Sequence, residues 1–113
     1  LGIDKNDIIK EEYNVNVITL SSYINDNISS DIDVIKIDVE GHEYECLRGL
    51  FNTSLDSNIH LIQLEYHNDD MYKNSISFNQ INDILNKNNF ELIKRFKHAF
   101  GEFEDLLYKN KMI

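Results

Sequence analysis

The stretch DVIKIDVEGHEYECLRGL, residues 33–50, decides the expected fold of this 113-residue chain. Its first seven residues, DVIKIDV, are rich in β-branched side chains and predict a strand. Gly41 then marks a sharp turn. The residues that follow predict a helix, because Tyr44, Leu47 and Leu50 fall on one helical face. A strand that leads directly into a helix is the basic unit of a parallel sheet with crossover helices.

The rest of the chain continues this alternation. The predicted strands are VNVIT (15–19), DVIKIDV (33–39), HLIQLEYH (60–67), FELIKRF (90–96) and EDLLYKN (104–110), and the predicted helices are LSSYIND (20–26), HEYECLRGL (42–50) and FNQINDILNKNN (78–89). Thr19 is the expected N-cap of the first helix, and Gly49 the expected break that ends the second. The fold class is therefore α/β: a mostly parallel sheet with crossover helices and a C-terminal antiparallel hairpin.

Length and composition restrict the classes of protein. A chain of 113 residues forms at most one domain, and its hydrophobic content of 42% is ordinary for a globular protein. A net charge of −9 argues against a nucleic-acid backbone or an anionic membrane surface as the main partner. The single cysteine, Cys46, suits a reducing compartment, so we expect a cytoplasmic protein in which Cys46 is a core side chain. No apolar run approaches the roughly 20 residues needed to cross a bilayer.

Polar side chains gather where two of the predicted strands end. Side chains alternate between the faces of a strand, so Glu65 and His67 share the face opposite Leu64. Asp38 and Glu40 follow the end of the strand 33–39 in the same way. Ligands of parallel α/β sheets bind outside the carboxyl ends of the strands. If the two strands are parallel neighbours, these four polar groups converge on one rim and line a pocket.

Each of these groups also has a structural explanation. Asp38 is equally suited to accept hydrogen bonds from the free amides of the next helix or to bind a ligand. For Glu43, a favourable position near the positive end of the helix dipole is sufficient. Gly41 allows a backbone angle closed to other residues or a close approach by a ligand. His67 is our preferred general base, against the alternative of a surface histidine. We expect Lys36 to pair with a carboxylate such as that of Glu65 rather than to act in catalysis.

The string VIKIDVEGHEYECLRGL, followed by IHLIQLEYH, resembles the FkbM-type methyltransferases. The residues that carry the resemblance are Lys36, Ile37, Asp38, Val39, Glu40, Gly41, Glu43, Leu47 and Gly49. The upstream VNVITLSSYI is similar to a strand and helix of the family, although Ser21 stands where the family commonly has Asp. The resemblance covers residues 15–110, since NFELIKRF and EDLLYKN look like the closing strands.

This resemblance implies a Rossmann-like class I methyltransferase that uses S-adenosyl-L-methionine and methylates a hydroxyl oxygen. The implied acceptor is a small-molecule, sugar or lipid hydroxyl. In such folds a glycine-rich turn holds the cofactor and an acidic residue binds its ribose, but neither element occurs here. Residues 1–113 are thus expected to be the C-terminal part of the domain, without the cofactor-binding part, and to bind the cofactor weakly. Asp38 and Gly41 are expected on the cofactor side, and Glu65 or His67 at the acceptor.

Two alternatives remain open at this point. A metal-dependent hydrolase would use Asp38, Glu40, Glu65 and His67 as ligands. A non-catalytic α/β interaction module would be a remnant of a larger domain. We also expect the polar stretch NDDMYKNS, residues 68–75, to help select the substrate.

Overall fold

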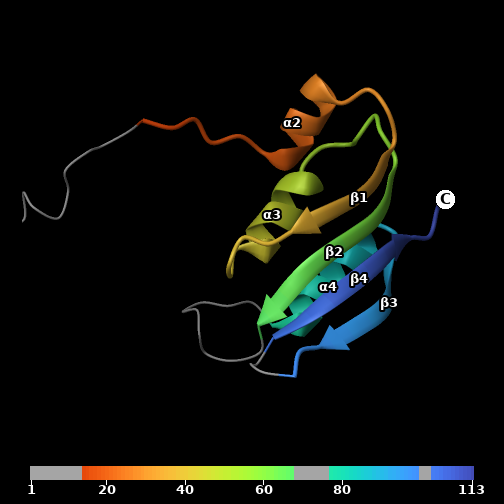
Figure 1. Ribbon diagram of the computed structural model, residues 1–113. Coiled ribbons are helices and arrows are strands. Elements are labelled where there is room, and N and C mark those ends of the chain that lie inside the picture. The colour runs from red at the N-terminus through yellow and green to blue at the C-terminus, as the bar shows by residue number, and fades with distance from the viewer. Residues whose placement is uncertain (1–13, 68–76, 100–102) are drawn as a thin grey trace, which may run out of the picture.

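The computed structural model describes residues 14–67, 77–99 and 103–113 (Figure 1). Along these residues the elements are α2 (Leu20–Asn27), β1 (Ile32–Ile37), α3 (Glu43–Leu50), β2 (Ile59–His67), α4 (Phe78–Lys87), β3 (Phe90–Lys97) and β4 (Phe103–Asn110). The stretch 68–75, expected to select the substrate, lies outside the described residues. No helix in the described part of the chain has the length and apolar character needed to span a membrane.

The strands form one mixed sheet in the order β1-β2-β4-β3. β1 and β2 are parallel neighbours joined through α3, as predicted, and β3 and β4 form the predicted antiparallel pair. β4 lies between β2 and β3 and runs antiparallel to both. The α/β class is therefore confirmed, but the expectation of a mostly parallel sheet is wrong for the described strands. The terminal hairpin places β4 inside the sheet, so two of the three strand pairings are antiparallel.

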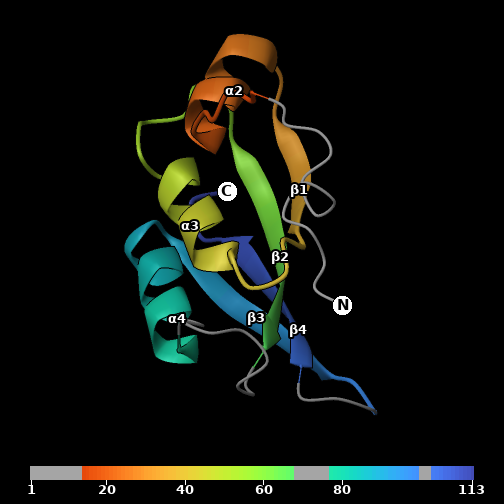
Figure 2. The ribbon, with the colours of Figure 1, turned by 90° about the vertical axis from the view of Figure 1, so that its left-hand side faces the viewer.

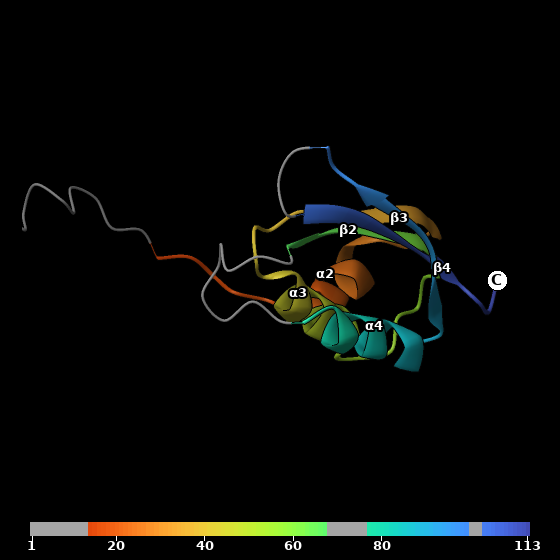
Figure 3. The same cartoon turned by 90° about the horizontal axis from the view of Figure 1, so that it is seen from below.

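The three helices of the described residues, α2, α3 and α4, lie on one face of the sheet (Figures 2 and 3). Register explains how that face is filled: Ile37 lies opposite Leu64, which in turn lies opposite Leu106. The buried core consists of Ile24, Ile37, Leu47, Leu50, Ile59, Ile62, Leu64, Ile81, Leu85, Phe90, Leu106 and Tyr108. No described element covers the other face, so the alternate side chains of β1 and β2 point away from the helices.

Local capping explains where two helices begin. The side chain of Thr19 accepts a hydrogen bond from the Ser22 amide at 3.2 Å, which confirms Thr19 as the N-cap of α2. Ser77 and Gln80 form a complete capping box at the start of α4. That box fixes where α4 begins after the segment that follows β2.

Two predictions about the first half of the chain are wrong. Residues 15–19 form no strand, because no described strand lies beside them to complete a ladder, and Val17 is 91% exposed. Gly49 does not break α3, which continues to Leu50. Instead, Gly49 lets α2 approach closely: a Cβ atom there would lie 3.4 Å from the backbone nitrogen of Leu20.

Candidate active site

The parallel strands β1 and β2 bring polar groups to one edge of the sheet, which we call the lip. The register pairs Lys36 with Gln63 and Ile37 with Leu64. One step further along, Asp38 follows β1 beside Glu65, near the end of β2. Asp38 therefore lies beside the end of β2 in the structure, as predicted.

Glu65 contacts both of its predicted neighbours at the lip. Its carboxyl group is near that of Asp38, which acts on its pKa, and its Oε1 atom lies 3.8 Å from Nε2 of His67. Burial raises the pKa of Glu65, and Asp38 raises it further, while His67 acts in the opposite direction. A carboxyl group with a raised pKa beside a histidine is a typical arrangement for proton transfer.

The hairpin of β3 and β4 adds two polar groups that the sequence did not predict, Asp105 on β4 and His98 directly after β3. Asp105 lies directly opposite Glu65 in the sheet, and its negative charge also raises the pKa of Glu65. Asp105 Oδ2 is in turn 3.0 Å from Nε2 of His98. The ring of Phe103 packs against both histidine rings, at 5.6 Å from His67 and 4.2 Å from His98. Only the register of the hairpin reveals these neighbours, and that register is not encoded locally.

The turn after β1 has an unusual backbone. Glu40 and Gly41 both have positive φ, 48° and 99°, the pattern of a type I′ turn, and the His42 amide donates to the carbonyl of Val39 at 3.4 Å. The prediction that Gly41 provides a special backbone angle is thus confirmed. Glu43, assigned only to the helix dipole, is 5% exposed and accepts hydrogen bonds from the amides of Val39 and Gly41.

Comparison with known proteins identifies the family of this chain. A family model described as the methyltransferase FkbM domain matches residues 4–92. The chain belongs to the FkbM methyltransferase domain family. No curated protein and no solved structure gives a significant match.

The matched region of this FkbM domain contains β1, the turn, α3 and β2, and therefore Asp38, Glu65 and His67. β4, with Asp105 and Phe103, lies beyond it, so the expected similarity of EDLLYKN to the family is not part of the match. The family motif and the lip thus coincide on β1 and β2.

One predicted site residue, Glu40, and the cation expected to pair with the cluster, Lys36, both lie outside it. Glu40 is exposed in the turn and has no hydrogen bond or ion pair with any described residue. Lys36 is exposed and forms no ion pair within the described part of the chain, so its expected pairing with Glu65 is wrong. Among the described residues no group of three or more His, Cys, Asp or Glu side chains is arranged to hold a metal ion. The four residues of the metal-hydrolase alternative are therefore not gathered as a ligand set.

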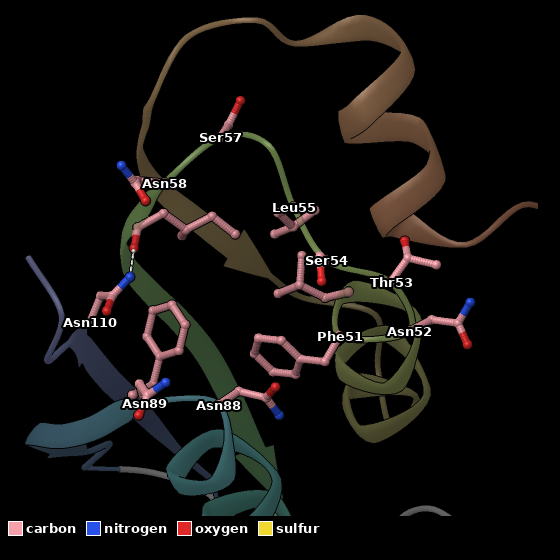
Figure 4. A pocket seen from close by; sticks show the side chains of 13 residues that line it. Phe51, Asn52, Thr53, Ser54, Leu55, Ser57, Asn58, Asn88, Asn89 and Asn110 are labelled. Carbon is pink, nitrogen blue, oxygen red and sulfur yellow. Dashed lines mark hydrogen bonds between the residues drawn. The ribbon is translucent and has the colours of Figure 1, made fainter.

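Hollows lie at both ends of the strands of this FkbM domain. One of about 440 Å³ lies beside the outer edge of β1, and Asp38, Val39 and Cys46 are among its lining residues. Burial, followed by the negative charges of Glu43 and Glu45, raises the pKa of the Cys46 thiol, as suits the predicted core side chain. The other, of about 460 Å³, lies at the opposite end of the sheet (Figure 4). Its lining contains no Asp, Glu, His, Lys, Cys or Arg side chain and so provides no general base.

Proposed function

We propose that the lip formed by β1 and β2 is the acceptor site of an S-adenosyl-L-methionine-dependent O-methyltransferase. The observation that carries this proposal is the contact of Glu65 with both Asp38 and His67, within the region matched by the FkbM domain. The acceptor is a hydroxyl group of a small molecule, a sugar or a lipid. We also propose that residues 1–113 form the C-terminal part of the methyltransferase domain, because the sequence has no glycine-rich turn after a strand.

The hollow beside β1 suits one end of the proposed cofactor. S-adenosyl-L-methionine is a sulfonium cation that supplies the methyl group. Asp38 provides a carboxylate at this hollow, while Leu20, Ile35 and Val39 provide apolar walls. A carboxylate beside an apolar wall complements the cationic methionine end. No described residue takes the part of the glycine-rich turn or of the acidic ribose-binding residue, so the complete cofactor requires contacts beyond these.

Glu65 and His67 act on the acceptor in this proposal. The acceptor hydroxyl would lose its proton to Glu65 or to His67 as its oxygen takes the methyl group, while the carbon–sulfur bond of the sulfonium breaks and a neutral thioether leaves. Asp38 neighbours Glu65 and acts on its pKa, and His67 lies within 3.8 Å of the same carboxyl group. Catalysis of this kind depends mainly on the alignment of donor, acceptor and base.

The test is methyl transfer by the full-length protein that contains this chain. Radiolabelled S-adenosyl-L-methionine is offered with a panel of sugar, lipid and small-molecule alcohols. His67→Ala should lower turnover by a factor of about 100 or more, with much less effect on cofactor binding. His60→Ala, a substitution at the opposite end of β2, is the matched control and should retain turnover. Unchanged turnover in His67→Ala would remove His67 from the site.

The proposed division of the domain has its own measurement. In isothermal titration the 113-residue chain alone should bind S-adenosyl-L-methionine with millimolar or weaker affinity. Micromolar affinity of the isolated chain would contradict the proposal that the cofactor-binding part lies elsewhere.

A further inference from the structure

Glu43 is a buried charged group that the proposed chemistry does not use. It is the first residue of α3 and is 5% exposed, although it is a glutamate. Burial of a carboxylate is unfavourable unless hydrogen bonds compensate for the lost water. The position near the helix dipole does not explain this burial, because Glu45 lies in the same first turn with an exposed side chain.

Among the described residues, the compensation comes from the turn after β1. The Val39 amide donates to Oε2 of Glu43 at 3.1 Å, and the Gly41 amide lies 3.2 Å from both carboxylate oxygens. Glu40, between these two donors, has a φ of 48° that is unfavourable for a side chain with a Cβ atom. The carboxylate therefore holds the amides on both sides of the strained residue.

We infer that Glu43 is a positioning residue that holds the turn so that Asp38 stays against Glu65. The path from Glu43 to Asp38 is short, because the Val39 amide that donates to Glu43 belongs to the peptide group that follows Asp38. Once that peptide plane is fixed, the backbone at Asp38 has little freedom to turn its carboxyl group away. The relevance to methyl transfer rests on the proposed function, whereas the positioning itself does not.

The positioning can be measured in the 113-residue chain without cofactor or acceptor. The side chain of Glu65 is titrated by NMR in the wild type and in Glu43→Gln, with Glu45→Gln as the matched control and Asp38→Asn as the reference for complete loss of the contact. Glu65 is surrounded by Asp38, His67 and Asp105, and Glu43 does not act on it directly. A fall of the Glu65 midpoint in Glu43→Gln thus reports movement of Asp38. We expect that fall in Glu43→Gln and Asp38→Asn and none in Glu45→Gln.

A wild-type measurement covers the case in which Glu43→Gln does not fold. The amide proton shifts of Val39 and Gly41 should change together with the protonation of Glu43, since both amides donate to its carboxylate. Independent behaviour of these two amides, or a Glu65 midpoint in Glu43→Gln equal to that of the wild type, would overturn the inference.

The consequence for the reaction is tested in the full-length protein. Glu43→Gln should lower kcat by a factor of about 10 to 100, as expected when a reacting group is misplaced, while Glu45→Gln stays within about twofold of the wild type. If the wild type transfers methyl groups and Glu43→Gln is equally fast, the positioning role in the reaction is wrong. If the wild type transfers none, the proposed function fails, and the Glu65 titration still decides the positioning.

Discussion

Arg95 provides a severe test of how this small sheet is stabilised. Its guanidinium forms an ion pair with Glu104, whose side chain is only 2% exposed, and lies 4.4 Å from the ring centre of Phe78. The second carboxylate oxygen of Glu104 has no hydrogen-bond donor among the described residues. Arg95 is therefore the one described partner of a buried charge, and Arg95→Met removes that partner while it keeps an apolar stem over the ring.

The size of the effect follows from the burial of the two partners. Removal of one member of a buried ion pair costs about 3–5 kcal/mol. Arg95 is 43% exposed, and this access to water reduces the cost to about 2–3 kcal/mol. Loss of the cation–π interaction with the Phe78 ring adds about 0.5–1 kcal/mol. We expect Arg95→Met to lower the free energy of unfolding by about 3 kcal/mol, a large part of the total of a small domain.

Urea unfolding at neutral pH measures this loss, and two controls isolate its cause. Lys94→Met removes an exposed cation that lies 4.7 Å from the Phe96 ring centre and has no buried carboxylate as partner. It should cost less than about 1 kcal/mol. In a Glu104→Leu background, Arg95→Met should likewise cost only about 1 kcal/mol, because no buried charge is left behind. An equal cost of Arg95→Met in both backgrounds would refute the reasoning.

Three further predictions concern single side chains. Gly49→Ala should raise the free energy of unfolding by about 0.5–1 kcal/mol, because alanine has the higher helix propensity. Gly49→Ile should lower the free energy of unfolding, because the larger side chain meets the backbone of α2. Urea unfolding of both variants measures the two effects. Burial raises the pKa of Tyr108 to about 12, above its ordinary value of 10. The contribution of the neutral Tyr108 side chain to the free energy of unfolding is therefore complete below pH 10 and is lost as the pH rises from 10 to 12. Unfolding at these pH values, compared with Tyr108→Phe, measures that loss. The Cys46 thiol, with its raised pKa, should react with iodoacetamide at mildly alkaline pH more slowly in the native chain than in urea, as mass spectrometry would detect.

Much of the fold could be predicted because its signals are local. β-Branched residues and strand periodicity identified β1 and β2, in which Ile37 and Leu64 are buried core residues. The capping hydroxyl of Thr19 located the start of α2. The same alternation placed Glu65 and His67 together on the opposite face, so the centre of the candidate site followed from strand periodicity and the parallel arrangement of two strands.

The features that were missed depend on pairing or on backbone angles. Residues 15–19 have strand-forming side chains, but a strand requires a neighbour, and the described sheet offers none. Asp105 became a neighbour of Glu65 only because β4 inserts between β2 and β3. The burial of Glu43 depends on the positive φ of Glu40, which sequence does not reveal for a glutamate.

Alternate side chains of β2 point to opposite faces of the sheet, so that one set packs in the core and the other lies at the candidate site. Ile62 and Leu64 are fully buried beneath the helices, while Glu65 and His67 follow on the face that no described element covers. One strand therefore connects the core to the side chains proposed to act on the acceptor, yet each side chain belongs to only one of these two sets. Two ionised carboxyl groups side by side repel each other, and after the larger effect of burial the negative charge of Asp38 accordingly raises the pKa of Glu65. The free energy gained by burying the core thereby keeps the carboxyl groups of Asp38 and Glu65 close together, although their proximity is unfavourable by itself. In the proposed function, the same burial holds the proton acceptor in place for the substrate.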